Sequence, residues 1–181
     1  RGLQTGRTHR RFPPDGYPPM SVEITIQPIT AAAFAPYGDL IDCAGDPDAI
    51  INLGKCGRYN DRAQMAFDGA RAGLSLFNAK IRTLPYEFNL LERHPLGSQA
   101  FVPMSNDGFL VIVAPDQNDK PGTPVAFETK PSQAINFHKG TWHGVLTPLS
   151  GTGHFAVVDR IGDGNNLQEF SLPTPHIVVS G

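Results

Sequence analysis

Two short segments of the chain carry the residues best suited to bind a metal ion. Glu92 and His94 lie two residues apart, so on a strand their side chains point to the same face. Gln99 follows a predicted bend at residues 95–97 and opens the next strand within reach of that face. His143 opens a strand in the second segment. Carboxylate, amide and imidazole donors suit a divalent ion such as Mn, Fe, Co, Ni or Zn, so we predict that the four side chains converge inside a β-barrel as a metal site.

The same four side chains also have a metal-free interpretation. An isolated histidine on a strand is more often a hydrogen-bonded core or surface residue than a metal ligand, and short motifs give many false matches. The alternative is therefore a polar pocket in which these groups donate and accept hydrogen bonds.

Four residues beside these segments are candidate catalytic groups: His138, Lys139, Asp159 and Arg160. His138 ends a predicted strand, and Lys139 follows in a turn, where it either binds a carboxylate, acts as a general acid or is an exposed turn residue. Asp159 and Arg160 are neighbours on a predicted strand, so one faces the pocket and the other faces solvent or a partner. Arg93 stands between two of the predicted ligands, and by the same alternation we interpret it as structural or as an interface residue.

Short β-strands are the elements that must position these residues. Val22, Ile24 and Ile26 alternate with polar residues, which is the pattern of a half-buried strand. The chain holds 19 glycines and 17 prolines, about 20% of its residues against an average of roughly 12%, and this favours turns over long helices. One helical turn is predicted over residues 31–34, with Thr30 as its N-cap. About ten short strands at regular spacing predict an all-β sandwich, jelly roll or barrel with few short helices.

Composition excludes several classes of protein. The 181 residues carry a formal net charge of −2, which argues against a nucleic-acid partner and against binding to an anionic membrane surface. Hydrophobic residues make up 40%, enough for a core, and no apolar run approaches the roughly 20 residues of a membrane-spanning helix. Cys43 and Cys56 are the two cysteines, and we interpret them as reduced thiols of a cytoplasmic protein.

Residues 1–19 differ in character from the remainder of the chain. They are rich in arginine and proline and show no period of 2 or 3.6, whereas patterned sequence begins directly after Met20. We therefore predict that residues 1–19 are a disordered N-terminal extension and that residues 20–181 form the folded domain.

The predicted metal ligands resemble the motifs of the cupin superfamily. The first cupin motif is H-x-H-x(3,4)-E, and here Glu92, His94 and Gln99 stand at its three positions. The second is P-x-G-x-x-H, which residues 138–143 match with histidine in place of proline. The resemblance implies a cupin-like double-stranded β-helix, or jelly-roll barrel, around a metal site.

Longer runs resemble the ureidoglycolate lyase family within that superfamily. The matching runs are E-R-H-P-L-G-S-Q-A-F-V-P at 92–103, N-F-H-K-G-T-W-H at 136–143 and F-A-V-V-D-R-I-G-D-G-N-N at 155–166. The resemblance extends over residues 24–172. It implies a homodimeric C–N lyase of the amidine-lyase type that cleaves ureidoglycolate to glyoxylate and urea, a late step of allantoin and purine breakdown.

The expected cofactor is a single divalent ion, namely Ni, Mn or Zn. No glycine-rich dinucleotide loop follows a predicted strand, so no organic cofactor is expected. Two other functions use the same pattern of residues. One is a different metal-dependent cupin enzyme, such as a dioxygenase or a sugar-acid isomerase, and the other is a non-catalytic barrel that binds a small acid.

Overall fold

The computed structural model of the chain describes residues 20–181, and β-strands dominate its regular structure. The prediction of disorder over residues 1–19 lies outside the described residues. The described strands are, in chain order, β1 (Val22–Thr25), β2 (Gln27–Pro28), β3 (Gly38–Ile41), β4 (Ala49–Ile51), β5 (Cys56–Arg58), β6 (Arg71–Asn78), β7 (Tyr86–Arg93), β8 (Gln99–Pro103), β9 (Phe109–Ala114), β10 (Val125–Glu128), β11 (Ala134–Phe137), β12 (Trp142–His143), β13 (Thr147–Pro148), β14 (His154–Ile161) and β15 (Gln168–Val179).

The predicted helical turn is present as α1 (Ala31–Phe34). The Thr30 hydroxyl accepts a hydrogen bond from the Ala33 N–H at 3.1 Å, which satisfies a donor left free at a helix start. Phe34 is fully buried and anchors the turn in the core. Pro36 lacks an N–H and helps to end the helix. Within residues 20–181, no helix combines the length and the apolar character that crossing a bilayer requires.

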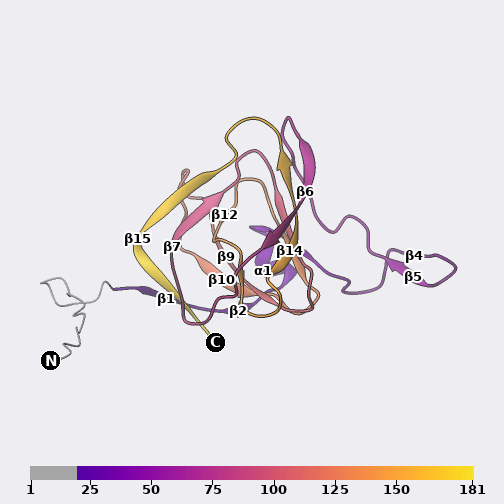
Figure 1. The fold of residues 1–181 in the computed structure, drawn as a ribbon, viewed down its shortest axis with the longest axis horizontal. Helices are drawn as coiled ribbons and strands as arrows, with labels where there is room; N and C mark the ends of the chain where they lie inside the picture. Colours follow the sequence, from indigo (N-terminus) through magenta and orange to yellow (C-terminus); the bar gives the residue numbers. More distant parts are fainter. Residues whose placement is uncertain (1–19) are drawn as a thin grey trace, which may run out of the picture.

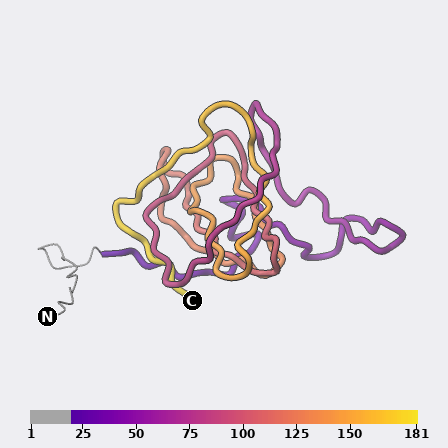
Figure 2. Tube along the Cα trace, in the orientation of Figure 1, coloured from indigo at the N-terminus to yellow at the C-terminus, as the bar shows by residue number. Residues whose placement is uncertain are grey.

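Two sheets face each other and form a nearly closed barrel (Figure 1). The larger sheet has the order β1-β15-β7-β12-β9-β10-β2, with β13 also paired to β9, and the smaller has the order β3-β11-β8-β14-β6. Because β1 pairs in parallel with β15, the first and last described strands lie side by side (Figure 2). The β4–β5 hairpin projects away from the barrel (Figure 1). The prediction of an all-β, cupin-like barrel with few short helices is confirmed.

Apolar side chains from both sheets fill the barrel interior. One cluster consists of Ile29, Phe34, Phe101, Phe109, Val111, Val113, Phe127, Ile135, Phe137, Phe155 and Val157. Strand β9 is buried along its whole length, because a second cluster that includes Ile112 and Trp142 covers its other face. A strand buried on both faces has a continuous apolar sequence, which explains the F-L-V-I-V-A run. This doubly buried strand pairs with β12, which carries His143.

Candidate metal centre and active site

Strand pairing brings the two predicted segments together inside the barrel. In the register of β7 and β12, His143 lies directly opposite Glu92, and opposed residues in antiparallel strands point to the same side. His94 follows the end of β7. The turn between β11 and β12 is tied to it, because the Gly140 N–H donates to the His94 carbonyl at 2.9 Å. Gly140 has a φ of 81°, a conformation that glycine adopts without strain.

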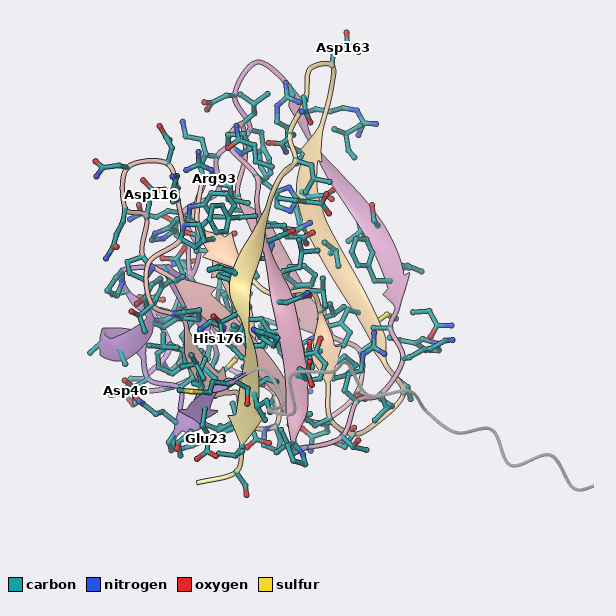
Figure 3. All side chains as sticks on the ribbon, turned by 90° about the vertical axis from the view of Figure 1, so that its left-hand side faces the viewer. Glu23, Asp46, Arg93, Asp116, Asp163 and His176 are labelled. Carbon is teal, nitrogen blue, oxygen red and sulfur yellow. The ribbon has the colours of Figure 1, made fainter. Side chains whose placement is uncertain are left out.

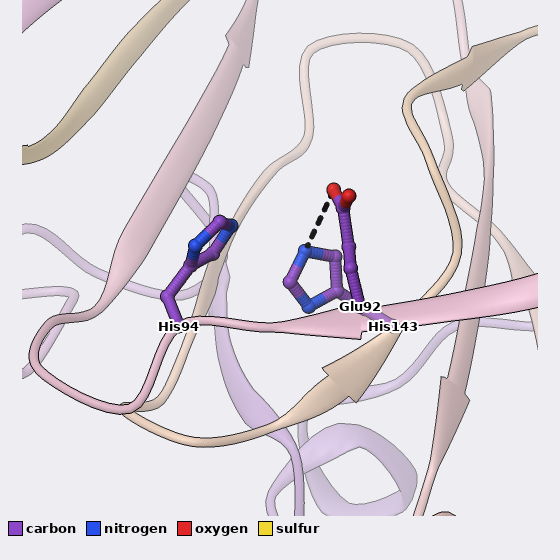
Figure 4. Close-up of side chains that lie close together, drawn as sticks. All are labelled: Glu92, His94 and His143. Atoms are coloured by element: carbon purple, nitrogen blue, oxygen red, sulfur yellow. Dashed lines mark ion pairs between the residues drawn. The ribbon is translucent and has the colours of Figure 1, made fainter. Parts of the chain in front are cut away.

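Glu92, His94 and His143 form a compact group of potential metal ligands (Figure 4). One ligand atom from each residue lies within 4.8 Å of the other two. His143 Nε2 lies 3.6 Å from Glu92 Oε1. His143 is only 2% exposed, whereas the Glu92 side chain is 23% exposed. The group is therefore buried on the His143 side and reaches solvent on the Glu92 side.

Backbone carbonyls set the tautomer of both histidines. His94 Nδ1 lies 2.7 Å from the Asn166 carbonyl oxygen, and His143 Nδ1 lies 2.9 Å from that of Thr141. A carbonyl only accepts hydrogen bonds, so each Nδ1 carries a proton, and Nε2 is the nitrogen whose lone pair can bind a metal ion when the ring is neutral. Both Nε2 atoms are buried and lack a hydrogen-bond partner within residues 20–181. Metal-binding histidines are oriented by hydrogen bonds of this kind.

The electrostatics of the group favour the protonation states in which it binds a cation. The contact with His143 lowers the pKa of Glu92 and outweighs the opposing effect of burial. Burial lowers the pKa of His94, and the neighbouring charge of His143 acts in the same direction. A low carboxyl pKa keeps Glu92 negative, and a low imidazole pKa keeps His94 neutral. Both groups are therefore ready to act as ligands at neutral pH.

Gln99 and Asp159 lie together beside this group. The pairing of Val158 with Ala100 places the two residues on neighbouring strands. Gln99 Oε1 and Asp159 Oδ1 are both buried and without a hydrogen-bond partner among the described residues. Burial raises the pKa of Asp159, although the neighbouring Gln99 amide opposes the shift. Asp159 is thus the carboxyl group in this region that most readily holds a proton.

Asp159 and Arg160 face opposite sides of β14, and the structure shows which one enters the barrel. Asp159 shares its side with the core residues Phe155 and Val157. Arg160 lies on the outer side, where its Nε donates to the Asp68 carbonyl at 2.8 Å and its Nη2 to the Asp163 carbonyl at 2.9 Å.

Lys139 lies in the turn before β12 and pairs with a residue for which the sequence offers no motif. Its Nζ pairs with Asp68 Oδ2 at 2.7 Å, and both side chains are about half exposed. Asp68 belongs to a loop that is fastened to the turn before β8, because its N–H donates to the Leu96 carbonyl at 2.9 Å. An exposed pair of this kind is weak, so a bound acid can compete with Asp68 for Lys139.

His138 belongs to a different hydrogen-bond group. Its Nε2 lies 3.0 Å from Asp39 Oδ1, and Asp39 Oδ2 accepts from Asn136 Nδ2 at 2.9 Å and from the Gln64 N–H at 2.9 Å. Burial alone would raise the pKa of Asp39, but these donors together lower it. Asn136 alternates with the core residue Ile135 along β11, so this group lies outside the barrel interior.

The barrel is closely packed beneath the metal-ligand group. The cavity there has a volume of about 20 Å³ and is lined by Glu92, His143 and mainly apolar side chains such as Phe137. Such a volume holds about one water molecule. A ligand larger than a water molecule therefore does not fit inside this cavity, whose lining includes the partly exposed Glu92.

Comparison with known proteins identifies the family of the chain. The family model described as ureidoglycolate lyase matches residues 21–179. The chain is 54% identical over 156 residues to the ureidoglycolate lyase of Rhodobacter capsulatus, covering 86% of this chain and 97% of the relative. It is 47% identical over 156 residues to that of Chelativorans sp., covering 85% and 94%. It is 44% identical over 159 residues to ureidoglycolate lyase 2 of Rhizobium meliloti, covering 87% and 98%. The chain belongs to the ureidoglycolate lyase family.

Proposed function

We propose that this protein cleaves ureidoglycolate to glyoxylate and urea, as a C–N lyase of allantoin and purine breakdown. The observation that carries the proposal is the group of Glu92, His94 and His143, whose ligand atoms lie within 4.8 Å of one another and whose Glu92 side chain is partly exposed. The relatives that bear the name ureidoglycolate lyase align over more than four fifths of the chain.

The donor set fits a divalent metal ion. Three of the four predicted ligands present a buried ligand atom without a hydrogen-bond partner among the described residues, namely His94 Nε2, Gln99 Oε1 and His143 Nε2. Two lone pairs beside a carboxylate repel one another unless a cation or a proton lies between them. Glu92, His94 and His143 would hold Ni, Mn or Zn, with Gln99 as a fourth ligand. A bound ion supplies Lewis acidity that lowers the pKa of a coordinated hydroxyl and polarises a carbonyl.

The substrate places three demands on the protein. Its carboxylate must be held, the hydroxyl on the adjacent carbon must lose a proton, and the departing nitrogen must gain one. Lys139 is the candidate group that binds the carboxylate, because its exposed pair with Asp68 is weak and a bound acid can replace Asp68. Asp159 is the candidate acid that protonates the departing nitrogen, since its raised pKa favours its protonated form. Arg160 and His138 act from outside the barrel, where they hold the loop around Asp68 and the Asp39 group.

The reaction itself is tested by its products. Incubation of the purified protein with racemic ureidoglycolate should release glyoxylate and urea in equal amounts, with one enantiomer left unconsumed. Coupled enzymatic assays measure both products and also ammonia. Release of ammonia and carbon dioxide in place of urea would show an amidohydrolase and reject the lyase assignment.

We also propose that the protein is a homodimer that forms through the outer face of the smaller sheet. Leu74 and Leu76 on the edge strand β6 are 72% and 73% exposed, and Val102 on β8 is 40% exposed. Leu76 lies opposite Ala156, which extends the apolar face across β14. Exposed apolar patches of this kind mark interaction surfaces.

The free, exposed thiols of Cys43 and Cys56 support a reducing, cytoplasmic location.

The dimer face is tested by a charged substitution. Leu76→Lys should raise the dimer dissociation constant at least about 30-fold, because it places a charge in a contact worth about 2 kcal/mol per central residue. Sedimentation velocity over a range of concentrations measures the change. Leu167→Lys alters a leucine that is also exposed but lies outside this face, and it should leave the association unchanged. Dimers of unaltered stability in Leu76→Lys would place the interface elsewhere.

A further inference from the structure

Arg93 makes an unusually complete set of contacts on the outside of the barrel wall, directly behind the metal-ligand group. Its side chain is only 12% exposed. Nε donates to Gln168 Oε1 at 2.7 Å, Nη1 to Asp116 Oδ1 at 2.9 Å and Nη2 to Asp119 Oδ1 at 3.0 Å. Figure 3 shows Arg93 and Asp116 close together on this face. A guanidinium held by several charged hydrogen bonds has a well-defined position.

The same contacts hold Trp142, which directly precedes His143. The Arg93 guanidinium lies 4.5 Å from the centre of the Trp142 ring, a cation–π arrangement. Trp142 Nε1 donates to Asp116 Oδ1 at 2.9 Å, the same oxygen that accepts from Arg93. Arg93, Asp116 and Trp142 thus form one cluster, here called the outer clamp, that joins β7 to β12.

The outer clamp adds side-chain contacts to a short backbone pairing between β12 and β7, while β9 pairs with β12 on its other side. Strand β12 has only two residues, and its register with β7 consists of the single pair His143–Glu92. Arg93 lies between Glu92 and His94 in the chain, and Trp142 lies next to His143. Because neighbouring side chains alternate across a strand, holding the outward pair also fixes the direction of the inward ligands.

We propose that Arg93 is a positioning residue that, through Asp116 and Trp142, holds Glu92, His94 and His143 in the arrangement that binds the metal ion. This inference rests on the proposed metal site but not on the identity of the reaction. Lysine cannot replace Arg93 in this role, because its ammonium group lacks the planar fork of guanidinium N–H donors and makes a weaker contact with the indole ring of Trp142. Partners that orient metal ligands typically contribute 10- to 100-fold to metal affinity.

The test is a metal titration without substrate. Ni²⁺ or Mn²⁺ is added to metal-free wild type, Arg93→Lys and Arg71→Lys, and binding is followed by calorimetry and by the fluorescence of Trp142, the only tryptophan. Arg93→Lys should bind the ion about 10- to 100-fold more weakly, with altered Trp142 emission. Arg71→Lys is the matched control, since Arg71 contacts only the neighbouring Ala72 carbonyl among the hydrogen bonds found in the described residues, and its affinity should equal that of wild type.

A second variant tests the same inference in case Arg93→Lys does not fold. Asp116→Asn changes a side chain that is 45% exposed, so its folding cost is small, and it weakens both bonds of the outer clamp while keeping Trp142 as the probe. It should lower metal affinity in the same direction as Arg93→Lys. Wild-type affinity in both variants, with altered Trp142 emission, would overturn the inference, as would a wild type that binds no metal. Metal binding without lyase activity would reject only the proposed reaction.

Discussion

Replacement of His143 by alanine should lower kcat/KM for ureidoglycolate by about 10³-fold or more, with the barrel still folded. His143 Nε2 is one of three converging ligand atoms, and it has no hydrogen-bond partner in the described part of the chain. Lewis-acid stabilisation by a bound ion is worth several kcal/mol, and each 1.4 kcal/mol corresponds to about a factor of ten in rate. His94→Ala should give a loss of the same order, because it removes the second free Nε2.

His176 provides a matched control for this experiment. Like His143 it is buried, its Nδ1 lies close to the carbonyl of the residue two positions earlier, and its ring packs against a phenylalanine. His176→Ala should therefore cost stability comparable to that lost in His143→Ala, as measured by urea unfolding. Its kcat/KM should stay within a few-fold of the wild-type value. Equal losses of activity in the two variants would mean that His143 acts only through packing, and the assignment of the metal centre would fail.

Removal of metal by a chelator should lower turnover at least about tenfold, and added Ni²⁺ or Mn²⁺ should restore it. The expected loss follows from the Lewis acidity that an ion held by Glu92, His94 and His143 would supply to the reaction. The same experiment has a readout that does not depend on activity. A ligand that binds only the folded state at 100 times its dissociation constant stabilises that state by about 2.7 kcal/mol, so the Tm should fall on chelation and recover with the ion.

Elemental analysis of the treated protein decides how this result is interpreted. The activity of each preparation is compared with its measured metal content, and a preparation treated with chelator that is then saturated with Ca²⁺ serves as a control for recovery by an unsuited ion. Full activity in protein shown to be free of transition metals would remove the metal from the mechanism. The lyase reaction would then depend on Glu92, His94 and His143 as hydrogen-bonding and proton-transfer groups.

Much of the site could be predicted from local sequence, because local backbone geometry determines several of its features. The spacing of Glu92 and His94 predicts that both side chains point to one face, and the capped turn at Thr30 follows from its side-chain chemistry. The family motifs added the expectation of a cupin-like barrel, which the sheet arrangement confirms. The same alternation required Asp159 and Arg160 to face opposite sides, but it could not say which one enters the barrel.

The chain sequence by itself thus determined the strand class, the family and the residue types available for chemistry. Only the tertiary structure decided how those residues are used. The carbonyl that sets the tautomer of His94 belongs to Asn166, 72 residues away, and Asp68, which holds Lys139, comes from a loop without a motif. His138 pairs with Asp39, 99 residues earlier. Such contacts depend on the register and closure of the two sheets, and register is set by packing of the whole barrel rather than by any local pattern.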